Sequence, residues 1–92
     1  MIRLVIVDDH PIVRGGLRDT FADADDIVVV GEAADGAEGV ERAIGLSADV
    51  VLMDLRMPGT DGVAATAALR ERAPGVHVLI LTTFDGESDV LP

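Results

Sequence analysis

Cysteine and lysine are absent from the sequence, and aromatic residues make up only 2% of it. Without cysteine the chain has no disulfide framework and no thiolate metal site, which is typical of proteins from a reducing compartment. The scarcity of aromatic residues means that the core has to be built from Val, Leu, Ile and Ala. We therefore expect a cytoplasmic protein with an aliphatic core.

Long apolar runs are also missing. The apolar stretches are far shorter than the roughly 20 residues that a membrane-spanning helix needs. The first residues, Met1–Leu4, lead directly into a strand-like run, so we expect no secretion signal and no membrane association.

Positive charge is scarce as well. The net charge is −10, and all seven basic residues are arginines. A surface of this charge repels the phosphates of nucleic acids and of anionic lipids, so this segment by itself should bind neither.

Four short apolar runs, rich in β-branched residues, indicate strands. They are Ile2–Val7, Ile27–Val30, Val50–Met53 and Val76–Leu81. Their apolar character is nearly continuous rather than alternating, which is typical of a parallel sheet covered on both faces. With 49% hydrophobic and 26% charged residues, the chain has the composition of one folded domain.

Three segments with helical spacing separate these runs. They extend from about Pro11 to Phe21, from Gly36 to Leu46, and from Gly62 to Ala73, the last ending before the Pro74-Gly75 pair. The alternation of strands and helices predicts an α/β fold with an open parallel sheet. The side chains expected to face the sheet are Ile12, Val13, Gly16, Leu17 and Phe21 in the first helix, Val40, Ala43 and Ile44 in the second, and Val63, Thr66 and Leu69 in the third.

Polar residues follow three of the predicted strands. Asp8 and Asp9 come after the first strand, Asp54 after the third, and Thr82 after the fourth. In open parallel sheets, ligands bind beyond the carboxyl ends of the strands. If the first, third and fourth strands are neighbours, three carboxylates and a hydroxyl converge in one pocket.

Taken singly, each residue has a simpler interpretation. Asp9 or His10 could cap the helix that begins near Pro11, and Asp61 could cap the third helix. Asp54 could begin a turn, and Thr82 could simply end a strand. His10 and His77 are single histidines with no second ligand nearby, so we assign them no metal or catalytic role.

The coincidence of three carboxylates favours a metal site. Like charges at close range oppose one another's ionisation, there is no lysine to neutralise them, and no arginine lies near these strand ends except Arg56. Mg²⁺ prefers carboxylate and water oxygens, and it screens the charge that develops when a carboxylate attacks a phosphoryl group. Thr82 could then donate a hydrogen bond to a phosphoryl oxygen. The pattern predicts a phosphorylation site.

Three stretches together resemble the receiver domain of two-component response regulators: Val5–His10, Met53–Gly62 and Leu79–Thr83. The most specific of them is an Asp followed by Met-Pro and then Asp-Gly, between Asp54 and Gly62. The Asp-Asp-His-Pro and Thr-Thr-Phe-Asp sequences are similar to the NarL/FixJ-type subgroup. The resemblance implies a flavodoxin-like sheet of order 2-1-3-4 with helices on both faces.

The resemblance also implies a role for each residue. Asp54 would be the phosphoacceptor, phosphorylated by a sensor histidine kinase. Asp9 would bind Mg²⁺ directly, together with Asp54 and the backbone carbonyl of Arg56, and Asp8 would act mainly through water. Thr82 would be the switch hydroxyl. The domain would be no enzyme, but a phosphoacceptor that assists its own phosphorylation and dephosphorylation.

The chain departs from the family at its end. Family members continue into a fifth strand that carries a lysine, and into two further helices. NarL/FixJ-type proteins then add a helix-turn-helix DNA-binding domain. We therefore expect residues 1–92 to be a partial receiver from a transcription regulator, and to self-associate through an exposed fourth strand.

Two alternatives remain at this point. A pseudo-receiver, an interaction module of the same fold, would never be phosphorylated. A Mg²⁺-dependent phosphatase of the haloacid-dehalogenase kind also uses an Asp nucleophile, but that family places its second Asp two positions after the nucleophile, whereas Asp8 and Asp9 are adjacent.

Overall fold

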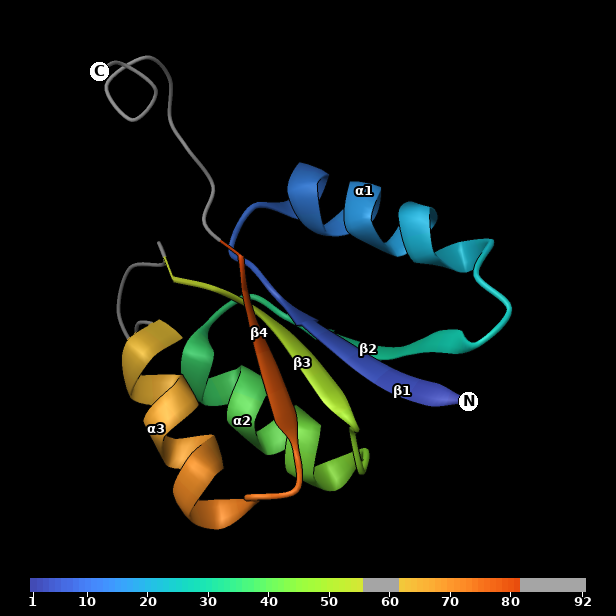
Figure 1. The fold of residues 1–92 in the computed structure, drawn as a ribbon. Coiled ribbons are helices and arrows are strands. Elements are labelled where there is room, and N and C mark those ends of the chain that lie inside the picture. The colour runs from blue at the N-terminus through green and yellow to red at the C-terminus, as the bar shows by residue number, and fades with distance from the viewer. Residues whose placement is uncertain (56–61, 82–92) are drawn as a thin grey trace, which may run out of the picture.

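The computed structural model describes residues 1–55 and 62–81, in which strands and helices alternate (Figure 1). The elements are β1 (Ile2–Val7), α1 (Pro11–Ala22), β2 (Ile27–Ala33), α2 (Gly36–Gly45), β3 (Val50–Asp54), α3 (Gly62–Arg72) and β4 (His77–Leu81). The predicted βαβαβαβ order is confirmed. Arg56, Asp61 and Thr82 lie outside the described residues.

The four strands form one parallel sheet of order β2-β1-β3-β4. Helix α1 covers one face of the sheet, and α2 and α3 lie side by side on the other (Figure 1). This is the predicted 2-1-3-4 arrangement. It places β1 and β3 next to each other in the middle, with Val7 paired to Met53.

The main core lies between the sheet and the pair α2 and α3. Its fully buried strand residues are Val5, Val7, Val51 and Met53, which share one face of the sheet because strand side chains alternate. Gly39 of α2 sits directly over Val7, and a Cβ atom at this position would lie 2.6 Å from Val7 Cγ2. A glycine therefore lets α2 approach β1 closely.

Four of the residues predicted to face the sheet are exposed: they are Gly16, Ile12 at 89%, Val63 at 64% and Ile44 at 37%. In α1 the large apolar residues that are partly buried are Val13, Leu17 and Phe21, a four-residue spacing that leaves Ile12 to one side.

In α3 the buried face contains the small residues Gly62 and Ala65 together with Leu69. Val63 lies on the opposite side of that helix, and Thr66 is only half-buried. In α2 the fully buried residues are Gly36, Gly39, Val40 and Ala43, whereas Ile44 lies one position off that face, near the end of the helix. The predicted Val40, Ala43 and Leu69 are buried, whereas alanine and glycine fill the rest of these two faces in place of the larger Ile44 and Val63.

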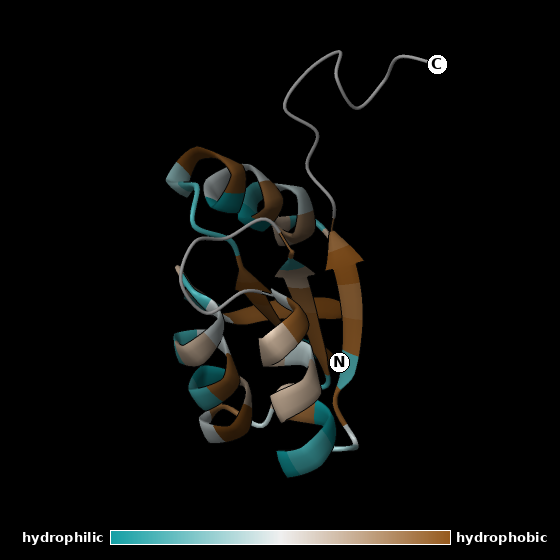
Figure 2. Ribbon diagram, turned by 90° about the vertical axis from the view of Figure 1, so that its left-hand side faces the viewer, coloured by the Kyte–Doolittle hydropathy of each residue, from teal (hydrophilic) through white to brown (hydrophobic). Residues whose placement is uncertain are grey.

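Strand β4 forms one edge of the sheet and is hydrophobic along most of its length (Figure 2). Leu79 and Ile80 in it are 57% and 47% exposed. Among the described residues, no helix is long and apolar enough to cross a bilayer.

Candidate functional site

Three carboxylates meet where β1 and β3 end. Asp54 is the last residue of β3, and Asp8 and Asp9 follow β1 directly. One ligand atom from each of these residues, together with one from His10, lies within 4.8 Å of the others. The predicted convergence of Asp8, Asp9 and Asp54, hereafter the carboxylate site, is confirmed as geometry.

Two of these carboxylates are completely buried. Asp8 and Asp54 are each 0% exposed, and Asp9 is half-buried. The Oδ2 atom of Asp8 has no hydrogen-bond partner among the described residues. Burying a carboxylate oxygen without a partner is costly, so such atoms usually mark the place of an ion or a water molecule. The donor set, carboxylate oxygens at a sheet edge, fits a hard divalent cation such as Mg²⁺.

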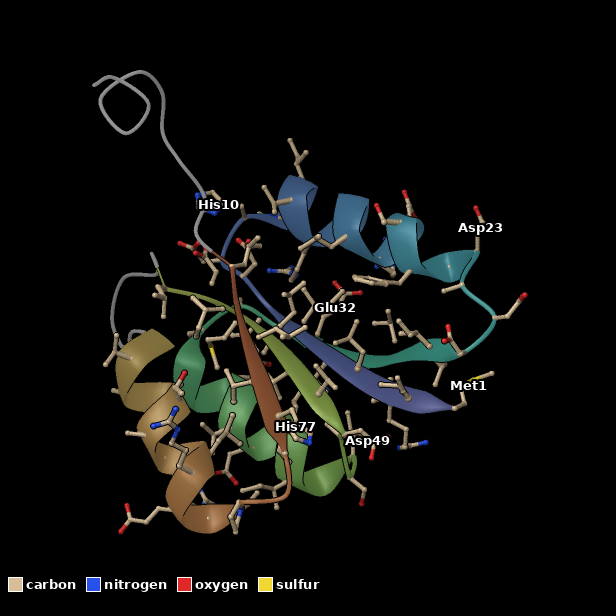
Figure 3. All side chains as sticks on the ribbon, in the orientation of Figure 1. Met1, His10, Asp23, Glu32, Asp49 and His77 are labelled. Carbon is tan, nitrogen blue, oxygen red and sulfur yellow. The ribbon has the colours of Figure 1, made fainter. Side chains whose placement is uncertain are left out.

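His10 also lies at the carboxylate site, and the sequence analysis did not predict this. Its backbone N–H donates a 2.8 Å hydrogen bond to Oδ1 of Asp8, and its Nδ1 atom lies 2.9 Å from the same oxygen. Nδ1 is also 2.9 Å from Oδ1 of Asp9. In Figure 3 the His10 ring lies among carboxylate groups at this end of the sheet, far from His77. The assumption that His10 has no second ligand nearby is therefore wrong.

The carboxylates raise the pKa of His10 above its ordinary value of 6.5. The hydrogen bond to Asp8 is the largest cause, followed by the charge of Asp9, while desolvation opposes them. The carboxylates thus favour the protonated form of the His10 ring. His10 is the residue at the N-cap of α1 but its side chain makes no capping hydrogen bond, so the capping interpretation of His10 is wrong.

Arg14 of α1 also contacts the carboxylate site, which the sequence analysis did not predict. Its Nη1 atom donates a 2.7 Å hydrogen bond to the backbone carbonyl of Asp8, and its Nε atom donates to Oε1 of Glu32 in β2 at 3.2 Å. Arg18 donates to the other oxygen of Glu32 at 2.8 Å. Arg14 follows the end of β1 closely in sequence and reaches it from the first turn of α1, so the view that only Arg56 lies near the strand ends is wrong.

Helix α3 begins against the backbone of Asp54. A Cβ atom on Gly62 would lie 2.6 Å from the carbonyl oxygen of Asp54 and 2.8 Å from Cα of Leu55. Only glycine fits here, and it fixes the position of the β3 end relative to α3.

Residues 4–91 match the protein family described as the response regulator receiver domain. The chain belongs to this family. Over 92 residues it is 45% identical to the transcriptional regulatory protein LiaR of Bacillus subtilis, covering all of this chain and 44% of LiaR. It is 38% identical over 88 residues to the nitrate/nitrite response regulator NarL of Escherichia coli, covering 96% of this receiver and 41% of NarL.

Solved structures agree with this assignment. The response regulator domain of Thermotoga maritima CheB aligns with a TM-score of 0.86 at 37% identity, covering 95% of this receiver and 64% of that chain. The receiver domain of NarL from Mycobacterium tuberculosis gives 0.84 at 38% identity, with 95% and 70% coverage. RcsB from Salmonella enterica, bound to promoter rprA in the presence of phosphomimetic BeF3−, gives 0.83 at 29% identity, with 98% and 76% coverage.

The predicted family and its NarL-type relatives are thus confirmed, and the chain is a receiver domain of two-component signalling with relatives among transcription regulators. The match lends no support to the phosphatase alternative. The receiver spans less than half the length of the curated relatives named above. What those whole proteins do therefore enters only as a proposal.

Proposed function

We propose that this receiver accepts a phosphoryl group on Asp54 from a sensor histidine kinase, with Mg²⁺ held at the carboxylate site. The observation that carries the proposal is the meeting of Asp8, Asp9 and Asp54 within 4.8 Å, two of them fully buried, at the carboxyl ends of adjacent parallel strands. A bound Mg²⁺ supplies charge screening for phosphoryl transfer.

The residues of the chain hold the reacting carboxylate and its neighbours in place. The end of β3 presents the Asp54 carboxylate as the nucleophile, and Gly62 keeps α3 tight against its backbone. Arg14 fixes the backbone of Asp8 from α1. Because the phosphoryl-transfer transition state is loose, positioning and electrostatics contribute most of the catalysis, and the domain needs no further covalent chemistry. In this proposal it is a phosphoacceptor rather than an enzyme.

The individual metal roles follow the family pattern. Asp9, whose side chain is 24% exposed, would hold the ion directly with Asp54 and the backbone carbonyl of Arg56, and the buried Asp8 would act through water. Thr82 is the switch hydroxyl. Arg56 and Thr82 lie outside the described residues, so their roles rest on the resemblance alone.

The whole protein, in this proposal, is a cytoplasmic transcription regulator. It joins a receiver, to which residues 1–92 contribute a part, to a C-terminal helix-turn-helix domain that binds DNA. The naming of LiaR as a transcriptional regulatory protein and the promoter-bound structure of RcsB support this arrangement. The net charge of −10 is consistent with DNA contact through another domain.

Phosphorylation of Asp54 is tested with acetyl phosphate and Mg²⁺, followed by mass spectrometry of the intact protein. We expect one phosphoryl group on the wild type and on the control Asp19→Asn, which changes an exposed Asp of α1, and none on Asp54→Asn. Equal labelling of Asp54→Asn would contradict the assignment. A folded wild type that binds Mg²⁺ but takes up no label would favour the pseudo-receiver.

A further inference from the structure

We propose that His10 is a fourth metal ligand of the carboxylate site and gives it affinity for imidazole-preferring ions such as Co²⁺ and Zn²⁺. The inference rests on the proposed function only in that it concerns the same carboxylate site. It adds the imidazole of His10 to the oxygen ligands of that site.

The distances around Nδ1 of His10 match those between ligands of one ion. Nδ1 lies 2.9 Å from Oδ1 of Asp8 and 2.9 Å from Oδ1 of Asp9. Ligands that bind an ion at about 2.1 Å lie about 3.0 Å from their nearest neighbours in an octahedron and about 3.4 Å in a tetrahedron. A metal ion can therefore replace the proton shared by these groups with only small side-chain shifts.

The buried Asp8 carboxylate is an independent observation that favours a cation at this site. Its side chain is fully buried, yet its Oδ2 atom has no hydrogen-bond partner among residues 1–55 and 62–81. The half-buried Asp9 likewise has an oxygen, Oδ1, that accepts no hydrogen bond there even though the imidazole is close. The imidazole therefore leaves part of the negative charge of these carboxylates without a partner among the described residues.

The backbone holds the imidazole in place. Asp8 Oδ1 accepts the His10 backbone N–H, and Pro11 follows at the first position of α1, which restricts the chain on both sides of His10. Arg14 ties the Asp8 carbonyl to the same helix. At the same time the His10 side chain is 55% exposed, so an ion and its water ligands can reach it.

The choice of ion follows from ligand chemistry. Carboxylates and water suit Mg²⁺ and Mn²⁺, whereas imidazole suits Zn²⁺, Co²⁺ and Ni²⁺. A histidine next to an all-oxygen site adds little to the affinity of that site for Mg²⁺, because Mg²⁺ prefers carboxylate and water oxygens. A site that includes His10 should therefore bind Co²⁺ and Zn²⁺ more tightly than Mg²⁺, and the difference should depend on the imidazole.

The test measures binding of Mg²⁺, Co²⁺ and Zn²⁺ separately by calorimetry, with the visible absorption of Co²⁺ as a second signal. His10→Asn is the test variant, and His77→Asn is the control, because His77 is the only other histidine and lies exposed at the opposite end of the sheet. We expect His10→Asn to weaken Co²⁺ and Zn²⁺ about 10-fold or more, in the range found when the surroundings of a metal ligand are disturbed, and Mg²⁺ much less. His77→Asn should change none of the three.

A second readout needs no variant. In the wild type, stoichiometric Zn²⁺, which is diamagnetic, should shift the ring nitrogen resonances of His10 and leave those of His77 unchanged. Unaltered His10 resonances, or an equal loss of affinity for all three ions in His10→Asn, would overturn the inference. Failure of the proposed function looks different: Mg²⁺ would not bind and Asp54 would not be phosphorylated, whatever the effect of His10 on Co²⁺.

Discussion

The two carboxylate oxygens of Asp8 have different surroundings. Oδ1 accepts the backbone N–H of His10 and faces the imidazole, whereas Oδ2 is buried without a partner among the described residues. A buried polar atom left in this way costs about 1–3 kcal/mol, more when it is charged. A bound cation removes this penalty only from the folded state, so metal binding and folding stability are coupled at this residue.

We expect Mg²⁺ to raise the melting temperature and Asp9→Asn to lose most of this shift. A ligand that binds only the native state stabilises it by RT ln(1 + [L]/Kd), about 1.4 kcal/mol at tenfold saturation. Thermal melts with and without millimolar Mg²⁺ measure the effect. Asp19→Asn, which removes an exposed carboxylate of α1, should keep the full shift. Absence of a shift in the wild type would count against the metal site, and an equal shift in Asp9→Asn would count against the role of Asp9.

At the scale of elements, the contact between α2 and β1 depends on a glycine. Gly39→Ala would place a methyl group 2.6 Å from Val7 Cγ2 in the packed core, and such overpacking typically costs about 1–3 kcal/mol. Gly16→Ala is the matched control, because nothing lies within 4 Å of a Cβ there and alanine stabilises a helix by about 0.5–1 kcal/mol. Urea unfolding should therefore show opposite changes, and a loss of stability in both variants would disprove the packing argument.

The ion pair between α2 and α3 predicts a pH dependence. Arg72 donates a 2.7 Å hydrogen bond to Glu41, and this bond, followed by the charge of Arg72, lowers the pKa of Glu41 below 4.5. A lowered pKa means that the stabilisation is present above the ordinary pKa and is lost as the pH falls through the lowered value. Arg72→Gln should therefore reduce the melting temperature slightly near neutral pH and not in strong acid.

The control for this pair is Arg70→Gln, which removes the same charge from the same helical turn. It should leave the difference between neutral and acidic pH unchanged. High salt should shrink the effect of Arg72→Gln, since both partners are exposed and their attraction is screened. A destabilisation by Arg72→Gln that is equal at both pH values would assign it to lost packing instead.

Local patterns were enough to predict which elements form, but not where β2 ends. The apolar run stops at Val30, yet the strand continues through Gly31, Glu32 and Ala33, because these residues pair with Val5–Val7 of β1. That pairing is set by a partner far away in sequence. In α3 the buried Leu69 was predicted, but Ala65 was missed and Val63 misplaced for a related reason, since alanines fit either side of a helix until a neighbouring layer selects one.

The carboxylate site could be predicted because strand ends in a parallel sheet share an edge, so Asp8, Asp9 and Asp54 meet once the strand order is known. His10 and Arg14 could not be found in this way. Their roles depend on a backbone turn and on the reach of a long side chain, which residue spacing does not record. The adjacency of His10 to the Asp pair was the one available signal.

In the whole molecule, the edge strand β4 is more exposed than the central strands β1 and β3. Leu79 and Ile80 of β4 are about half exposed, and β4 contains neither proline nor lysine. Among the described residues β4 pairs only with β3, and an edge strand of this kind is a template for pairing with another chain. We propose that the 92-residue chain self-associates through β4, as the sequence led us to expect.

Light scattering after size exclusion tests this association. We expect a dimer at high concentration that Leu79→Lys converts to a monomer. The control is Ile12→Lys in α1, which changes an apolar residue that is more exposed than Leu79; it should leave the dimer intact. A monodisperse wild-type monomer at high concentration would contradict the proposal, as would a dimer unaffected by Leu79→Lys.

The strand order also sets when the site exists during synthesis. β1 leaves the ribosome first but occupies the middle of the sheet, and its neighbour β3 follows only after α1, β2 and α2. Until β3 docks, Asp8 and Asp9 lack Asp54, and closing so long a loop is the slow, entropically costly part of folding such a topology. A nascent chain therefore cannot assemble the three-carboxylate site before the third strand has emerged and paired.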